Sequence, residues 1–360
     1  MKNLKEKNFI KFIPKYIGGE SIIKGKSGVI KLSANENPYG PSEKAIKVYK
    51  NISTNLAQYP DSSHLILKKT ISSLFDINIQ NIICGAGSDE IINLICHCFI
   101  GENDEAIHTE HGFAMYKIST LSYGGKPVSV KENYRITSVQ NIIAACNKKT
   151  KIIFLANPNN PTGTMISEDE LNFLISNVSK NILIVLDGAY AEYVDDYDGG
   201  INLVKNNENV IMLRTFSKIY GLGSLRVGWA FANQNIINVL MKIRSPFNLS
   251  SSGLNVASVA MQDQEYLNDC KIKNNNLRDW LTLELRKLNI EIDNSFANFI
   301  LARFRSKETS SMVDEYFKIN GILVRNVENY NIKNGLRITI GDKNACQKIK
   351  ALLFSIKDKL

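Results

Sequence analysis

Short, uninterrupted apolar segments recur through the first two thirds of the chain, and they restrict its fold more than any other feature. Each is strand-length and lacks the polar–apolar alternation of a half-exposed strand. Helical patterns such as residues 168–179 separate them. Strands that are apolar on both faces and alternate with helices predict an α/β fold, with a mostly parallel sheet between helices. The predicted strands are residues 82–84, 151–156, 182–186, 210–213 and 227–232.

The pattern changes near residue 263. Leu277, Leu281, Leu285 and Leu288 recur at helical spacing. We therefore expect an N-terminal arm at residues 1–30, a large domain at 31–262 and a smaller α+β domain at 263–360. In the smaller domain we predict strands at residues 299–304, 322–325 and 336–340, followed by a helix at 345–356.

Composition narrows the class of ligand. Lys and Arg number 44 against 35 Asp and Glu, a formal charge of +9, but no run reaches five basic residues. We therefore expect an anionic small molecule rather than nucleic acid. Six cysteines form no CxxC pair and only four His occur, so no metal site is predicted. Because the sequence lacks a membrane-span or signal-peptide pattern, we expect a reducing, cytoplasmic setting.

Lys218 is the last residue of the motif Arg214-Thr215-Phe216-Ser217-Lys218, which follows the apolar segment 210–213. Arg226 lies eight residues after Lys218. A lysine amine can condense with an aldehyde cofactor when its pKa is lowered. Ser217 and Arg226 supply a hydroxyl and a fixed cation, which suit a phosphate. A lysine alone is usually a surface residue, but this complete set after a strand is more specific.

Polar side chains also follow two other predicted strands. Asp187 ends the segment 182–186, and Asn160 lies in the turn after residues 151–156. Taken alone, Asp187 is better explained as a helix cap. With Lys218 31 residues later, we favour pairing with a protonated pyridine nitrogen, which makes the ring an electron sink. Asn160 and Tyr190 could then reach the ring's phenolic oxygen.

Three further features are weak by themselves. The turn Gly85-Ala86-Gly87-Ser88 opens a helix, where small residues and the helix terminus suit a phosphate. Tyr116 could stack on a planar ring or belong to the core, and Tyr59 could be an ordinary turn residue.

Together these motifs resemble the fold-type I aminotransferases that use pyridoxal 5′-phosphate, and among them the histidinol-phosphate aminotransferase family. The resemblance runs from about residue 30 to the C-terminus, and it implies a seven-stranded sheet in the large domain. Gly188 and His111 depart from the family pattern, which usually has Glu and Pro there. Seven ordered motifs carry the resemblance: residues 35–38, 59–61, 87–90, 159–163, 187–190, 214–218 and 336–341.

The resemblance implies a role for each matching residue. Lys218 would form the Schiff base, Asp187 would pair with the pyridinium, and Tyr190 would bind the phenolic oxygen. Tyr59 would reach the cofactor of a neighbouring subunit, which implies a homodimer. The remaining cofactor contacts would be Gly87, Ser88, Asp89, Tyr116, Asn160, Thr215, Ser217 and Arg226. The substrate's anionic end would meet Asn35, Arg325 and Arg337.

The implied reaction is ping-pong amino transfer between histidinol phosphate and 2-oxoglutarate, in histidine biosynthesis. Two other substrate classes stay open, because substrate choice depends on pocket shape. Related enzymes transaminate aromatic amino acids or decarboxylate threonine phosphate. A sensing domain of a transcription regulator would need an attached DNA-binding domain, for which residues 1–30 are too few.

Overall fold

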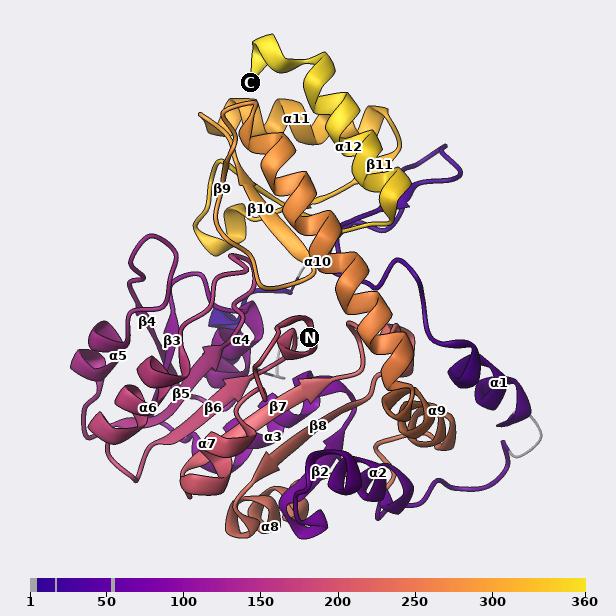
Figure 1. Cartoon of the computed structure of the whole chain (residues 1–360). Helices are drawn as coiled ribbons and strands as arrows, with labels where there is room; N and C mark the ends of the chain where they lie inside the picture. The colour runs from indigo at the N-terminus through magenta and orange to yellow at the C-terminus, as the bar shows by residue number, and fades with distance from the viewer. Residues whose placement is uncertain (1–4, 17, 53–55) are drawn as a thin grey trace.

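The computed structural model describes residues 5–16, 18–52 and 56–360. It has two layered bodies, a larger one built on a seven-stranded sheet and a smaller one formed mainly by the C-terminal residues (Figure 1). The long helix α10 (Gln264–Arg286) runs from one body into the other. The arm before residue 30 includes the 3₁₀ turn η1 (Asn8–Phe12), which contacts α4 (Ala114–Ser122) of the larger body.

The large sheet has the strand order β2-β8-β7-β6-β5-β3-β4. Strand β8 is antiparallel to both β2 and β7, whereas the remaining neighbours pair in parallel. The predicted mostly parallel, seven-stranded sheet is therefore confirmed. Its strands are β2 (Ile82–Gly85), β3 (Glu105–Thr109), β4 (Lys126–Val130), β5 (Thr150–Ala156), β6 (Leu183–Asp187), β7 (Val210–Thr215) and β8 (Gly228–Ala232).

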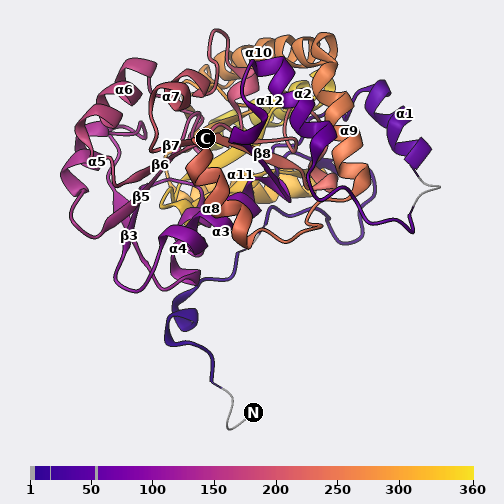
Figure 2. The ribbon, with the colours of Figure 1, turned by 90° about the horizontal axis from the view of Figure 1, so that it is seen from below.

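Helices cover both faces of this sheet, as Figure 2 shows. Each strand sends successive side chains to opposite faces: in β6, Leu183 and Val185 join one core cluster, and Ile184 and Leu186 join the other. One face carries α3 (Gly87–Phe99), α4 and α8 (Gln234–Ile243). The other carries α2 (Leu65–Phe75), α5 (Val139–Ala145), α6 (Glu168–Asn177), α7 (Ile201–Asn206) and α9 (Ser251–Gln262), with α1 (Glu43–Asn51) packed on α9.

One edge of the sheet gathers the polar motifs. Strands β2, β5, β6 and β7 run in the same direction and end there, and the reversed strand β8 begins there. The segments that follow the parallel strands, and the one that precedes β8, therefore converge on a single edge. This edge is where open α/β sheets bind ligands.

The smaller body has its own core and a four-stranded antiparallel sheet in the order β12-β13-β10-β9. A separate parallel pair joins β1 (Ile30–Lys31) to β11 (Ile322–Leu323). The prediction of one strand at 322–325 is wrong, because its two halves pair with different strands on either side of Val324. The sheet consists of β9 (Glu291–Ile292), β10 (Phe299–Arg303), β12 (Arg325–Asn326) and β13 (Gly335–Thr339), with α11 (Lys307–Ile319) and α12 (Lys343–Ser355) packed beside it.

The domain boundaries at residues 31 and 263 stay a proposal. Helix α10 begins at Gln264, close to the second boundary. Strand β1 and Leu32, however, pack into the core of the smaller body although they fall inside the proposed large domain.

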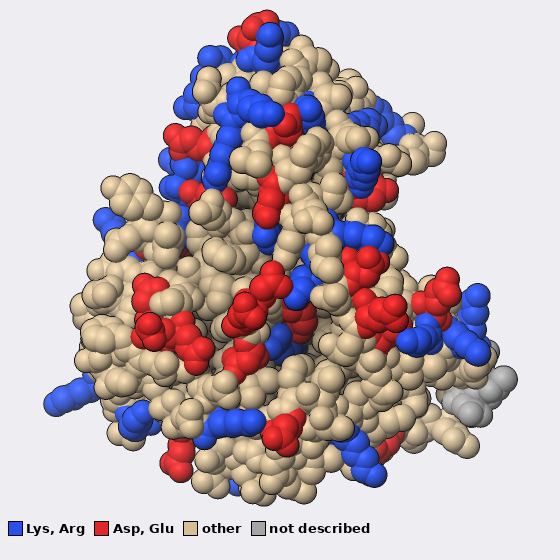
Figure 3. Space-filling model, in the orientation of Figure 1, with Lys and Arg blue, Asp and Glu red and all other residues tan. Residues whose placement is uncertain are grey.

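The surface seen in Figure 3 intermixes Lys and Arg with Asp and Glu and shows no single basic patch on that face. In the described part of the chain, no helix combines the length and apolar character needed to span a bilayer.

Ile184 offers a test of the fold, since it is fully buried in the central strand β6. Ile184→Ala removes apolar contacts and leaves a cavity, so we expect it to lower the free energy of unfolding by about 2–5 kcal/mol. Ile319→Ala, at a side chain that is 67% exposed, is the control and should change it by less than about 0.5 kcal/mol. Urea titrations of both variants measure the difference, and equal effects would contradict the assigned packing.

Candidate active site

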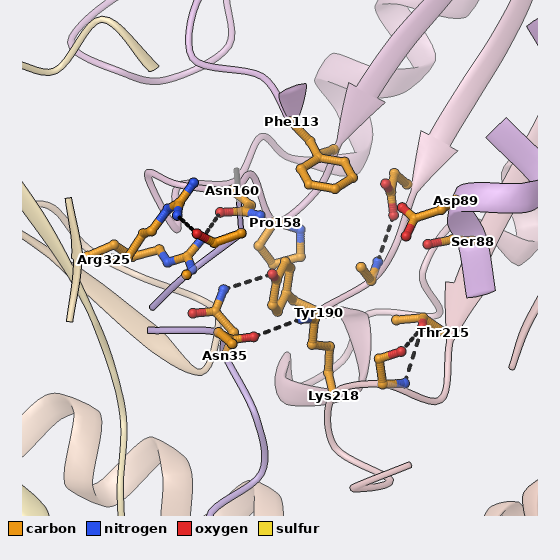
Figure 4. Close-up of a pocket in the computed structure, with 18 of the residues that line it drawn as sticks. Asn35, Ser88, Asp89, Phe113, Pro158, Asn160, Tyr190, Thr215, Lys218 and Arg325 are labelled. Atoms are coloured by element: carbon orange, nitrogen blue, oxygen red, sulfur yellow. Dashed lines mark hydrogen bonds between the residues drawn. The ribbon is translucent and has the colours of Figure 1, made fainter. Parts of the chain in front are cut away.

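A cavity of about 270 Å³ lies at the carboxyl edge of the large sheet, between the two bodies (Figure 4). Residues of both bodies and of the arm line it. Among the predicted site residues, Tyr59 and Gly87 do not line it. Those that do are Asn35, Ser88, Asp89, Tyr116, Asn160, Asp187, Tyr190, Thr215, Ser217, Lys218, Arg226, Arg325 and Arg337.

Lys218 is half-buried in the turn that follows β7. Its Nζ donates a hydrogen bond of 3.2 Å to the carbonyl oxygen of Ala34 and lies 5.7 Å from the centre of the Tyr190 ring. Desolvation, and then the positive charge of Arg337, lower the pKa of Lys218 to about 8. A substantial fraction of the amine is therefore uncharged at mildly basic pH, as a nucleophile or proton acceptor requires.

Asp187 is the last residue of β6 and is 5% exposed. One carboxylate oxygen accepts a 2.7 Å bond from the Tyr116 hydroxyl, and the other accepts a 3.1 Å bond from the backbone N–H of Ala189. Burial raises the pKa of Asp187 to about 6. A buried carboxylate of this kind is stabilised by a nearby cation, such as a protonated ring nitrogen.

Two aromatic residues of one motif line the cavity, and one of them, Tyr116, bonds to Asp187. Tyr116 is 1% exposed, and its ring stacks on Phe154 with centroids 4.8 Å apart. Phe113 meets Tyr116 edge-on at 5.8 Å and turns its own ring toward the cavity (Figure 4). Sequence reasoning missed Phe113, although it lies in the same motif as Tyr116. Ring stacking by Tyr116 stays a prediction, and Phe113 is a second candidate for it.

Tyr190 and Asn35 both line the cavity and contact each other. The Asn35 side-chain amide donates a 2.9 Å bond to the Tyr190 hydroxyl. Burial raises the pKa of Tyr190, so its hydroxyl stays protonated and can donate to a ligand. Asn35 has a left-handed backbone (φ 57°) and is held by Thr339, whose hydroxyl bonds both its N–H and its side-chain oxygen.

Ser88 at the start of α3 lines the cavity together with Thr215, Ser217 and Arg226, and we call this group the anion cradle. The Arg226 guanidinium donates to the Ser217 hydroxyl at 3.2 Å and forms a half-exposed ion pair with Asp89. A Cβ on Gly87 would lie 2.5 Å from Arg226 Nη2, so a side chain there would displace the guanidinium. Helix N–H groups, hydroxyls and a guanidinium together suit a phosphate.

Two guanidinium groups lie at the other end of the cavity. Arg337 is 6% exposed and donates to the Asn160 side-chain oxygen at 2.5 Å and to the Ser33 carbonyl at 2.8 Å. Its buried Nε has no hydrogen-bond partner among the residues that the structure describes. Arg325 donates to the carbonyl oxygen of Gly18 in the arm. This end of the cavity therefore suits an anionic group of a substrate.

Tyr59 lies away from the cavity. Its side chain is 82% exposed and stacks on Phe247 with centroids 4.7 Å apart. The structure also shows which groups surround Gly188 and His111, the two residues that depart from the family pattern. A Cβ on Gly188 would lie 3.2 Å from Arg214 Cδ, and His111 Nδ1 bonds the carbonyl of Tyr330, which lines the cavity.

Residues 27–351 match the family of class I and II aminotransferases. The chain is 50% identical to a histidinol-phosphate aminotransferase of Dinoroseobacter shibae, over 93% of this chain and 92% of that protein. It is 47% identical to one from Ruegeria sp., over 95% and 94%. The crystal structure of the Sinorhizobium meliloti histidinol-phosphate aminotransferase with pyridoxal-5′-phosphate has a TM-score of 0.91 at 23% identity, covering 98% of both chains. The Thermus thermophilus aspartate aminotransferase with maleate has a TM-score of 0.80 at 15% identity, covering 92% of both.

The raised pKa of Asp187 predicts a stability change. Because the folded-state pKa of about 6 exceeds the usual value of about 3.9, the ionised carboxylate destabilises the fold above pH 6. This cost disappears as the pH falls below about 4. Asp187→Asn should therefore raise the free energy of unfolding of cofactor-free protein by about 1–3 kcal/mol at pH 7.5. The gain should shrink at pH 4.5.

Urea unfolding at the two pH values measures this gain, with Asp358→Asn, an exposed carboxylate, as the control. A variant that is less stable than the parent at pH 7.5 would show that the Asp187 carboxylate is stabilised rather than strained in the folded protein.

Proposed function

Because the chain belongs to the class I and II aminotransferases, and within them to the histidinol-phosphate aminotransferase family, we propose that it transfers an amino group between histidinol phosphate and 2-oxoglutarate. The reaction belongs to histidine biosynthesis. One observation carries the proposal: Lys218 and Asp187 line the same cavity as Arg325 and Arg337, which lie at its far end.

We propose pyridoxal 5′-phosphate as the cofactor, and the residues of the cavity fit it. The cradle at the start of α3, where Gly87 leaves room for Arg226, suits the phosphate. Asp187 suits the ring nitrogen, and Tyr190 and the amide of Asn160 suit the ring oxygen. When bound, this group supplies an electron sink for negative charge that develops at the substrate's α-carbon.

In this proposal the chain's own residues hold and move the protons. Lys218 Nζ takes the proton from the substrate's α-carbon, and its pKa of about 8 is suited to that task. Asp187 holds a proton on the ring nitrogen through its negative charge. Tyr190 keeps its own proton and is oriented by Asn35.

Arg325 and Arg337 are proposed to bind the anionic end of each substrate. Two guanidinium groups suit the doubly charged phosphate of histidinol phosphate and the side-chain carboxylate of 2-oxoglutarate in the other half-reaction. The unpaired Nε of buried Arg337 supports this role, since a substrate anion would give it a partner.

We further propose a cytoplasmic homodimer. The exposed position of Tyr59 supports a role in a neighbouring subunit, because this side chain lies outside the cavity of its own chain. The six cysteines are all free thiols, which is typical of a reducing compartment.

Lys218→Ala should abolish turnover, with a loss of roughly 10²–10⁴-fold or more, because the variant has no amine to bind the cofactor covalently or move the proton. It should also lose the visible absorbance of the lysine-linked cofactor. Lys205→Ala, an exposed lysine, is the control. Borohydride reduction and peptide mass spectrometry identify the labelled lysine, and a label on another lysine would refute the assignment.

Substrate preference tests the proposed reaction directly. The purified enzyme should use histidinol phosphate in preference to tyrosine, phenylalanine and threonine phosphate. Arg325→Ala removes a charged hydrogen bond worth about 1.5–3 kcal/mol, so kcat/KM for histidinol phosphate should fall roughly 10- to 150-fold. Activity toward tyrosine should fall much less. Equal losses for the two substrates would reject the phosphate role of Arg325, and a wild-type enzyme inactive toward histidinol phosphate would reject the proposed reaction.

A further inference from the structure

A second buried polar cluster lies outside the cavity, around Arg244. This residue follows α8, and the segment 244–250 then passes the edge strand β2 to reach α9 on the opposite face of the sheet (Figures 1 and 2). Arg244 is 9% exposed. Its guanidinium donates to the Ser62 carbonyl at 2.7 Å, to the Asn248 side-chain oxygen at 2.5 Å and to His64 Nε2 at 3.0 Å.

Arg244 fixes the segment 61–64, which begins two residues after Tyr59. His64 is 1% exposed and has a left-handed backbone (φ 57°) at the start of α2. Burial, and then the charge of Arg244, lower the pKa of His64 to about 4, so its neutral ring can accept the bond from Arg244. The Asp61 carboxylate also accepts from the N–H groups of Ser63 and Leu65.

The same guanidinium also fixes the segment that carries Phe247, through its bond to Asn248. Tyr59 and Phe247, 82% and 49% exposed, stack on each other with centroids 4.7 Å apart. An exposed aromatic pair whose flanking segments are hydrogen-bonded to one buried guanidinium is suited to contact a partner.

Arg244 could influence an active site through either of two series of hydrogen bonds. The first runs directly through Ser62 and His64 to the Tyr59–Phe247 pair. The second reaches the chain's own anion cradle only through Asn248, whose amide donates to Glu90, the acceptor of the Ala86 N–H. Arg244 bonds directly to Ser62 and His64 in the first series, whereas it makes no direct contact with the anion cradle. The geometry therefore favours the first series.

We propose that Arg244 is a positioning residue that presents the Tyr59–Phe247 pair to the active site of a second copy of this chain. Loss of its guanidinium then impairs the neighbouring site and leaves its own intact. This inference rests on the proposed function and on the proposed dimer.

Subunit mixing distinguishes the two series. Arg244→Met should lower kcat/KM of the holoenzyme at least about tenfold, since small misplacements of positioning groups have effects of this size. Differently tagged Arg244→Met and Lys218→Ala subunits are co-expressed, and the heterodimer is isolated by both tags. In the heterodimer, the site that keeps Lys218 receives its Tyr59–Phe247 pair from the subunit that keeps Arg244. Its activity per dimer should therefore rise to about half that of the wild type.

A heterodimer no more active than the Arg244→Met homodimer would overturn the inference, and so would an Arg244→Met homodimer with wild-type activity. Should Arg244→Met fail to fold, Arg244→Lys takes its place, because it keeps the charge but cannot bridge Ser62 and Asn248 together. Arg286→Met is the matched control, since Arg286 also holds a carbonyl and an asparagine oxygen, those of Ile292 and Asn294. Wild-type and Arg286→Met proteins without aminotransferase activity would reject the proposed function instead, and sedimentation as a monomer would reject the dimer.

Discussion

The common direction of the strands in the large sheet determines where the candidate active site lies. Every strand of that sheet except β8 runs the same way, so the turns after β2, β5, β6 and β7 open on one edge. The reversed strand β8 starts at this edge and places Arg226 beside the start of α3. Side-chain alternation along β6 then turns Asp187 toward the face that carries Tyr116. Groups distant in sequence thus meet without long loops.

The cavity concentrates charged groups that water would otherwise stabilise. Burial raises the pKa of Asp187 and lowers those of Lys218 and Arg337. Each shift has a free-energy cost in the folded protein. A ligand with a cationic ring and an anionic end would offset the costs at Asp187 and Arg337, because it would supply each with a partner of opposite charge. On the proposed function, stability given up at the site would become binding energy for the ligand.

Local sequence predicted the groups whose position follows from a strand end. Lys218, Asp187 and Asn160 each come after an apolar run and line the cavity. Residue-level reasoning missed β3 and β4, because β3 contains Glu105 and His108 and β4 begins with an exposed Lys126 and a Pro. It also missed Phe113 and the Arg244 cluster. Arg244 and His64 are 180 residues apart, and no local pattern encodes such a contact.

The pairing of β1 with β11 has a consequence for how the chain is made. Ile30 pairs with Ile322, so β1 leaves the ribosome long before the strand with which it pairs. At roughly 5–20 residues per second, β1 waits on the order of 15–60 seconds with its backbone unpaired. The large sheet can form during that interval, whereas the core around Leu32 cannot close. The smaller body is thus completed only after both β1 and β11 have been synthesised.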